Sequence, residues 1–279
     1  MDYLFLTPLG LGILIGILMG LTGAGGGILS VPLLVFFLHL QVVEAAPIAL
    51  TAIAISAGVG AFLGFRNKLL RYKAAAFMAI IGLLLSPAGL WLAHRIPNHP
   101  LLILFSCTLF YVSSRLYLEA RREILGITPP SQKPPPCLIN PEHGRLTWNL
   151  PCAQALLFSG GLAGFLSGLL GVGGGFIIVP ALKRYTNLPV QSIVVTSLGV
   201  LAIISSGSAI VSAATGHLVL NIAIPFAIFS AISSASTSSF IKRFPDSLKA
   251  FNSSVQISIF FSSSLFFFPC LLFLKLTPH

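Results

Sequence analysis

The chain has 279 residues, of which 56% are hydrophobic and only 8% are charged. Soluble domains carry about 25% charged residues, so this composition excludes an ordinary soluble protein. Several apolar runs of about 18 or more residues indicate membrane helices, and one membrane domain is enough to hold them. A formal charge of +10 suggests nucleic acid in a soluble protein. Here we attribute it to cytoplasmic loops that follow the positive-inside bias, and we expect no nucleic-acid partner.

The first apolar tract, residues 4–38, is interrupted by the segment "GLTGAGGGILSVP" at 20–32. As a single helix the tract would be about 52 Å long, against a hydrocarbon core of about 30 Å. As two full spans it is too short, because the arm at 28–38 covers only about 16 Å. A hairpin that enters and leaves the membrane on the same side fits the tract.

Further along the chain, hydropathy predicts six membrane spans and a linker. A polar, proline-rich and charged stretch at 119–150 reads as a linker outside the membrane. A second glycine segment, "GLLGVGGGFIIVP", follows it at 168–180. The predicted spans are 45–65, 73–94, 100–118, 190–213, 218–241 and 249–274.

The two glycine segments belong to an internal repeat. Residues 12–34 align with 160–182 at a constant offset of 148, with 13 of 23 positions identical. The sequence therefore predicts a first membrane repeat at 1–118, the linker at 119–150 and a second membrane repeat at 151–279.

The distribution of Lys and Arg selects a topology. If each glycine segment were one ordinary span, the 16 cations would divide ten to six between the two sides. If each is a re-entrant hairpin, fourteen lie on one side, and only Arg95 and Lys275 lie opposite. We therefore expect an all-α membrane protein of two inverted repeats, each a re-entrant glycine-rich broken-helix hairpin plus three transmembrane helices, with a cytoplasmic linker and an outside N-terminus.

The glycines have two interpretations. Those spaced by four match the small-residue pattern of tight helix packing, and we assign them to packing: Gly12, Gly16, Gly20, Gly160, Gly164 and Gly168. Irregular backbone at membrane depth is tolerated where it is buried in protein or lines a cavity, and its N–H groups can hold an anion. We expect the remaining glycines to bind substrate at a ligand-lining turn, with a purely structural turn as the alternative: Gly23, Gly25, Gly26, Gly27, Gly171, Gly173, Gly174 and Gly175.

Polar side chains follow each hairpin. Hydroxyl and amide groups can bind an oxyanion without a counter-charge, whereas Ser and Thr can also bond to carbonyls of their own helix. Thr51 and Ser56 lie in the first half, and Ser205 and Ser206 in the second. The candidate side chains that we expect to bind substrate are Thr51, Thr196, Ser197, Asn252 and Gln256.

Charged residues are excluded from the span centres. The absence of Asp, Glu, Lys and Arg there argues against a cation pathway or a carboxylate proton relay. The four cysteines show no CxxC spacing, so we expect no metal site. Cys137 and Cys152 flank a turn-rich piece of the linker, and in a reducing cytoplasm we expect both to be free thiols.

The chain resembles the sulfite exporter TauE/SafE family of membrane permeases. The resemblance is carried by "GLTGAGGGILSVP" followed by "LTAI", and by "GLLGVGGGFIIVP" followed by "VTSL". It implies transport of a small sulfur-containing anion such as sulfite, thiosulfate or an organosulfonate across a bacterial inner membrane, with no enzymatic activity and no cofactor. The first half has "LTAI" where the second keeps "TSL", so Thr51 matches the pattern less well than Thr196 and Ser197.

Two other functions remain open from the sequence. One is a permease for another small inorganic or organic anion, since no residue in the sequence is specific for a sulfur-containing group. The other is a non-transporting membrane assembly subunit, against which the broken hairpins and the polar cluster on the final span argue.

Overall fold

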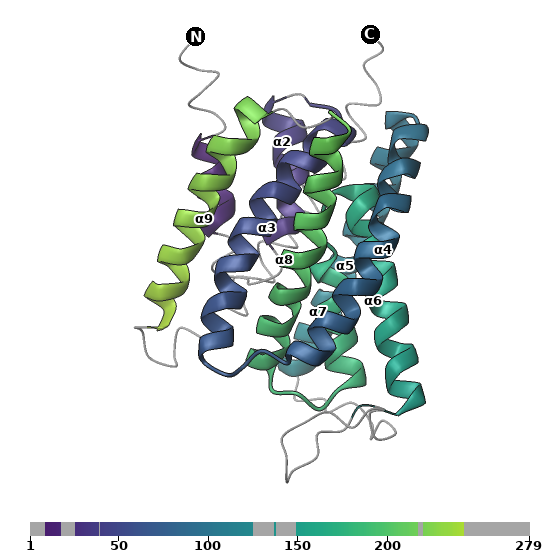
Figure 1. Cartoon of the computed structure of the whole chain (residues 1–279), viewed down its shortest axis with the longest axis vertical. Helices are drawn as coiled ribbons and strands as arrows, with labels where there is room; N and C mark the ends of the chain where they lie inside the picture. The colour runs from purple at the N-terminus through teal and green to yellow at the C-terminus, as the bar shows by residue number, and fades with distance from the viewer. Residues whose placement is uncertain are drawn as a thin grey trace.

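A computed structural model of the chain describes residues 9–17, 26–38, 40–124, 137, 149–216 and 220–242. Within these residues the fold is helical apart from short turns and one isolated β-bridge, as the all-α expectation requires (Figure 1). Residues 9–17 form a helix. The helices that follow are α2 (Gly26–Leu38), α3 (Val42–Arg66), α4 (Tyr72–Arg95), α5 (Asn98–Ile124), α6 (Leu150–Leu170), α7 (Gly175–Tyr185), α8 (Val190–Ala214) and α9 (Leu220–Lys242).

Five of the predicted spans overlap α3, α4, α5, α8 and α9, and the sixth, 249–274, lies outside the described residues. By length and hydropathy, four described helices can cross a membrane: α3, α4, α6 and α8. The presence of α6 among them differs from the expectation of a hairpin arm. Its 21 residues form an unbroken helix of about 31 Å, whereas the 11 residues of α7 reach only about 16 Å.

The exterior of the helices is apolar. Large hydrophobic side chains are exposed on helices from both halves, among them Leu84 (72%), Phe158 (73%) and Ile210 (68%). Apolar surface of this extent is costly in water but favourable against lipid tails. The chain is therefore a multi-pass membrane protein.

Helices of one half pack mainly on helices of the other. α4 packs against α6 and α8, and α3 packs against α8 and α9. The core is accordingly shared: Ile53 and Leu170 belong to one cluster of buried apolar side chains. The boundaries at 118 and 151 stay a prediction.

Glycines allow close helix packing in both halves. A Cβ added to Gly160 would lie 2.8 Å from the carbonyl oxygen of Met78 on α4, and one added to Gly12 would lie 2.9 Å from that of Phe226 on α9. Side chains at these positions would force the helices apart. The packing interpretation is confirmed for Gly12, Gly16, Gly160, Gly164 and Gly168, and Gly20 lies outside the described residues.

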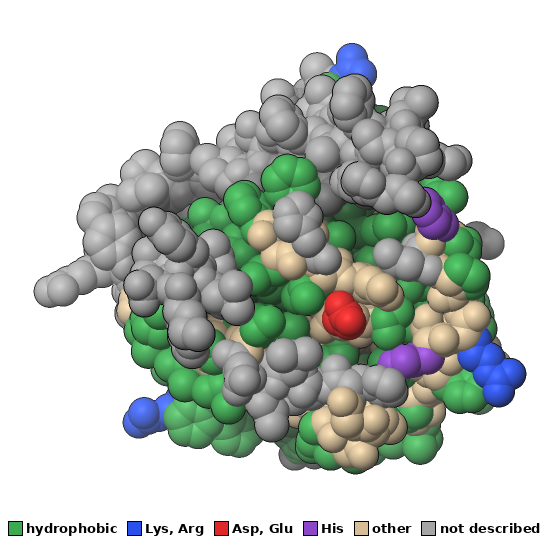
Figure 2. Space-filling view, turned by 90° about the horizontal axis from the view of Figure 1, so that it is seen from above, with side chains coloured by type: hydrophobic (Ala, Val, Ile, Leu, Met, Phe, Trp, Pro, Cys, Tyr) green, Lys and Arg blue, Asp and Glu red, His purple; other side chains and the backbone are tan. Residues whose placement is uncertain are grey.

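Most of the described Lys and Arg residues lie at one end of the helices (Figure 1). The α3–α4 loop and the last turns of α7 and α9 lie at the lower end of Figure 1. They carry Arg66, Lys68, Arg71, Lys73, Lys183, Arg184 and Lys242. Arg95 lies at the opposite end, where its guanidinium stacks 4.3 Å from the ring centre of Trp91. Figure 2 views that opposite end, and Lys and Arg appear only at its edge.

Candidate functional site

The second glycine segment forms a buried left-handed turn between α6 and α7. Gly171, Gly173 and Gly174 have φ angles of 72°, 76° and 74°. Only glycine adopts such angles at low cost. Gly171 ends α6, and its N–H donates to the carbonyl of Ser167 at 2.8 Å. The glycines therefore allow the chain to reverse direction inside the protein.

The outer ends of α6 and α7 lie together, so the two helices form a hairpin. Cys152 in the first turn of α6 is disulfide-bonded to Cys137, with their Cα atoms 5.1 Å apart. The backbone N–H of Cys137 also donates to the carbonyl of Tyr185, at the end of α7, at 3.1 Å. One residue of the linker thus joins the start of α6 to the end of α7.

The disulfide corrects the expectation about the cysteines. Cys137 and Cys152 are not free thiols, and both side chains are fully buried. The sequence-based expectation failed because it derived the state of the cysteines from the assumed compartment, whereas the fold brings the two residues into bonding distance. Among the described residues, Cys107 is a free cysteine and is exposed.

The first glycine segment meets this turn. A Cβ added to Gly27, at the start of α2, would lie 3.1 Å from the carbonyl oxygen of Val172. Ile53 on α3 lies against both segments, because a Cβ on Gly27 or on Gly173 would approach it to 3.1 Å. The N-terminal ends of α2 and α7 therefore converge at Ile53.

Two buried hydroxyl groups near the turn have no hydrogen-bond partner within the described part of the chain. They belong to Ser205 on α8 and to Ser167 on α6, and neither side chain is exposed to solvent. The Ser205 Oγ lies 3.3 Å from the position of a Cβ on Gly173, so it faces the turn. An unpaired buried hydroxyl costs about 1–3 kcal/mol, which makes these groups candidates for ligand contact.

Backbone donors at the start of α7 lie at the same place. α7 begins at the left-handed Gly174 without a side-chain cap. The N–H groups of Ile177 and Ile178 donate to the Gly174 carbonyl, so those of Gly175 and Phe176 precede the first bonds of the helix. A helix N-terminus also carries the equivalent of about half a positive charge. The turn thus offers a partial positive charge and donor groups to an anion.

The surroundings of the turn are neutral. Cβ atoms placed on its left-handed glycines would meet Ala46, Ile53, Ala163, Leu201 and Ser205. The nearest cations along α7 are Lys183 and Arg184, which lie in its last turn. Any negative charge bound at this turn is therefore balanced by dipoles and hydroxyl groups.

The hydroxyl groups of three other predicted site residues, Thr51, Thr196 and Ser197, have partners within the protein. The hydroxyls of Thr51 and Ser197 donate to the carbonyls of Ile48 at 2.7 Å and Val194 at 2.8 Å on their own helices. The Thr196 Oγ1 accepts a bond from the backbone N–H of Arg71 at 3.2 Å. Thr196 is also about 13 Å along α8 from Ser205.

The remaining predicted site residues divide into two groups. Gly26 and Gly27 are the first residues of α2, and Gly175 is the first residue of α7. Gly23, Gly25, Asn252 and Gln256 lie outside the described residues.

Ser167 was missed from the sequence as a candidate. Its signal was weak, since one Ser in an apolar helix normally bonds to its own carbonyls. Its position four residues before the left-handed Gly171 could have indicated it. Ser205 was noted as polar, but nothing in the sequence separates it from Ser206, whose hydroxyl donates to the carbonyl of Ile203 at 2.9 Å.

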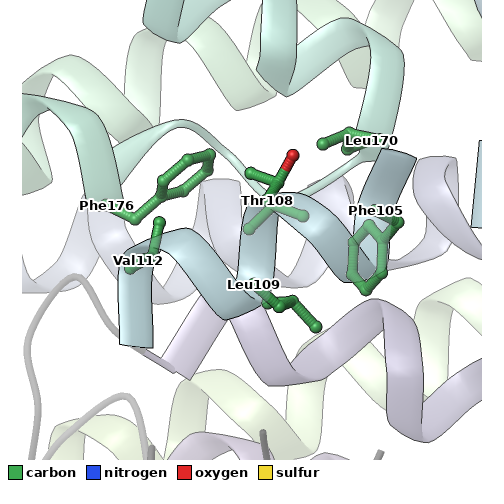
Figure 3. A pocket seen from close by; sticks show the side chains of 7 residues that line it. Phe105, Thr108, Leu109, Val112, Leu170 and Phe176 are labelled. Carbon is green, nitrogen blue, oxygen red and sulfur yellow. The ribbon is translucent and has the colours of Figure 1, made fainter. Parts of the chain in front are cut away.

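A small apolar pocket lies between α5 and the α6–α7 turn (Figure 3). Its one polar side chain is Thr108, whose hydroxyl donates to the carbonyl of Leu104 at 2.8 Å. A pocket of this composition does not attract an anion. Its lining consists of Phe105, Thr108, Leu109, Val112, Leu170, Val172 and Phe176.

Comparisons with known proteins give concordant matches. The family model described as sulfite exporter TauE/SafE matches residues 9–276. A probable membrane transporter protein of Methanocaldococcus jannaschii is 30% identical over 244 residues, which cover 83% of each chain. A probable membrane transporter protein of Xylella fastidiosa is 30% identical over 196 residues, covering 69% of this chain and 68% of the relative. No solved structure gives a significant match.

Proposed function

This chain belongs to the sulfite exporter TauE/SafE family and is a membrane permease, and from that premise we propose that it moves a small sulfur-containing anion through a site near the membrane midplane. The substrates considered are sulfite, thiosulfate and organosulfonates. The two glycine-rich segments form the site, as re-entrant hairpins of two inverted repeats.

The observation that carries the proposal is the meeting of Gly27 with the carbonyl of Val172. Broken helices at matching positions of two repeats are the best pointer to a transporter binding site. α2 ends beside the start of α3 at the upper end of Figure 1, and α7 ends at the lower end. Opposite directions of this kind support an inverted relationship between the repeats.

The proposed orientation places the linker in the cytoplasm of a bacterial cell, with the protein in the inner membrane. The gathering of cations at the lower end supports this placement. The disulfide between Cys137 and Cys152 opposes it, because disulfides are rare in the reducing cytoplasm. We give more weight to the cations, since several loops and helix ends at the lower end carry them. A buried disulfide, in contrast, is shielded from cytoplasmic reductants.

The test is uptake and counterflow in proteoliposomes that contain the purified full-length protein. A panel of labelled oxyanions should include sulfite, thiosulfate, an organosulfonate, nitrate and phosphate. We expect saturable counterflow of a sulfur-containing anion. Counterflow of phosphate or nitrate alone would identify a permease for another anion, and no counterflow of any anion would contradict the proposal.

A further inference from the structure

We infer that the turn at Gly171–Gly175 binds a singly charged anion in preference to a doubly charged one, and that Ser205 is the side chain that holds it. The inference rests on the proposed function, because it names the charge class of the substrate and a residue of the same site. It rests on the charge balance of the turn and on the unpaired hydroxyl that faces it.

The positive charge available at the turn amounts to about one elementary charge. The helix N-termini of α2 and α7 converge at Ile53. Each supplies the equivalent of about half a positive charge, so the two together balance one negative charge. The residues around the turn add none, since those that its Cβ positions would meet are all neutral.

The apolar stretches outside the described residues also carry no cation in their sequence. Neither the first glycine segment, 20–32, nor the apolar tract 250–274 contains Lys or Arg. A second negative charge at the turn would therefore stay unbalanced. The cost of burying an ion rises with the square of its charge, so a dianion costs about four times as much as a monoanion.

Ser205 provides the specific contact. Its hydroxyl is fully buried, faces Gly173 and has no partner within the described residues. A hydroxyl group can donate to an oxyanion oxygen, and it can also accept from the O–H of a protonated one. It therefore suits a sulfonate or hydrogensulfite equally well, and Ser167 offers a second hydroxyl of the same kind.

The test uses probes of fixed charge. Proteoliposomes with the full-length protein are loaded with methanesulfonate, a permanent monoanion, and the entry of labelled methanesulfonate is followed. Sulfate, a dianion, and dimethyl sulfone, a neutral analogue, are added as competitors at constant ionic strength. We expect saturable counterflow that unlabelled methanesulfonate inhibits and that equal concentrations of sulfate and dimethyl sulfone leave unchanged.

Variants of three serines on α8 locate the contact. Ser205→Ala should raise the half-saturating concentration of methanesulfonate about ten- to a hundredfold, since it removes a hydrogen bond to a charged ligand. Its thermal stability should be unchanged or higher, because an unpaired buried hydroxyl is removed. Ser212→Ala removes another buried unpaired hydroxyl, and Ser206→Ala removes a paired one. Both should transport normally.

The outcomes separate this inference from the proposed function. Inhibition by sulfate as strong as that by unlabelled methanesulfonate would leave the permease standing and overturn the preference for a monoanion. An unchanged half-saturating concentration in a folded Ser205→Ala protein would overturn the role of Ser205. Counterflow of no anion at all would overturn both the proposed function and the inference.

Discussion

Gly27 and Val172, which are 145 positions apart in the chain, lie against each other at the point where the two glycine segments meet. A Cβ on Gly27 would come within 3.1 Å of the Val172 carbonyl oxygen, which is tighter than ordinary van der Waals contact. This contact brings the starts of α2 and α7 together in the protein interior. The predictions below depend on that relationship.

The contact between Gly27 and Val172 predicts that a single methyl group added at position 27 affects transport. Gly27→Ala should impair transport, because the added Cβ presses on a backbone carbonyl that cannot move without shifting the turn. Gly58→Ala on α3 is the matched control, since no atom lies within 4 Å of its Cβ position. Alanine there should raise stability by about 0.5–1 kcal/mol. Counterflow rates and thermal unfolding of the two variants give the comparison, and equal transport by both would argue against a functional contact.

The left-handed turn predicts a graded loss of stability. Gly174→Ala and Gly216→Ala each place a side chain at a φ angle near 75°, which costs about 1–2 kcal/mol. At Gly216 nothing else lies within 4 Å, whereas at Gly174 the Cβ would also lie 2.5 Å from the carbonyl oxygen of Ala163. We expect Gly216→Ala to transport normally and Gly174→Ala to lose transport and to unfold at a lower temperature. If the two variants unfolded at the same temperature, the result would contradict the close approach of position 174 to Ala163.

Lys183 and Arg184 should affect capture rather than binding. Both are exposed in the last turn of α7, and exposed charges attract anions over about 10 Å at 0.1 M salt. Lys183→Ala with Arg184→Ala should slow uptake at low ionic strength, and the difference should vanish at high ionic strength. Arg95→Ala, at the other end of the helices, is the control for a change of net charge. Loss of binding at every salt concentration would instead place the site at Lys183 and Arg184, in the last turn of α7.

The Thr196 hydroxyl is predicted to stabilise the folded protein. Its hydroxyl accepts from the backbone N–H of Arg71, which is part-buried, and Thr196→Val removes this hydrogen bond at a cost of about 0.5–1.5 kcal/mol. Thermal unfolding of Thr196→Val beside Ser197→Ala measures the effect, since the Ser197 hydroxyl bonds only within its own helix. A raised half-saturating anion concentration in Thr196→Val without loss of stability would instead return Thr196 to the binding site.

The disulfide predicts a pattern of thiol reactivity. In protein isolated without reductant, Cys137 and Cys152 should not react with a maleimide, because they are joined in a disulfide. After denaturation and reduction, mass spectrometry should find label on Cys137 and on Cys152. Labelling of Cys137 before reduction would show that the linker is not joined to α6.

The sequence anticipated the elements that hydropathy and repetition control. Apolar length predicted α3, α4, α5, α8 and α9, and the matched glycines indicated where the backbone breaks. Hydrogen-bond and disulfide partners that depend on the folded chain could not be predicted from the sequence. The Thr196 hydroxyl accepts from a backbone group 125 positions away, and only the folded structure distinguishes the unpaired Ser205, which faces Gly173, from the paired Ser206. Cys137 met Cys152 because the linker returns to the hairpin, which composition does not reveal.

Substrate protection of a cysteine at position 205 tests the location of the site most directly. Ser205→Cys is introduced into a protein in which Cys107 and Cys270 are replaced by serine, with Ser212→Cys as the control. Reaction with methyl methanethiosulfonate is followed in proteoliposomes with and without a saturating concentration of the transported anion. We predict that the anion slows modification at position 205 severalfold and leaves position 212 unchanged. An equal rate at position 205 with and without the anion, in a protein that still transports it, would contradict a binding site at the glycine turn.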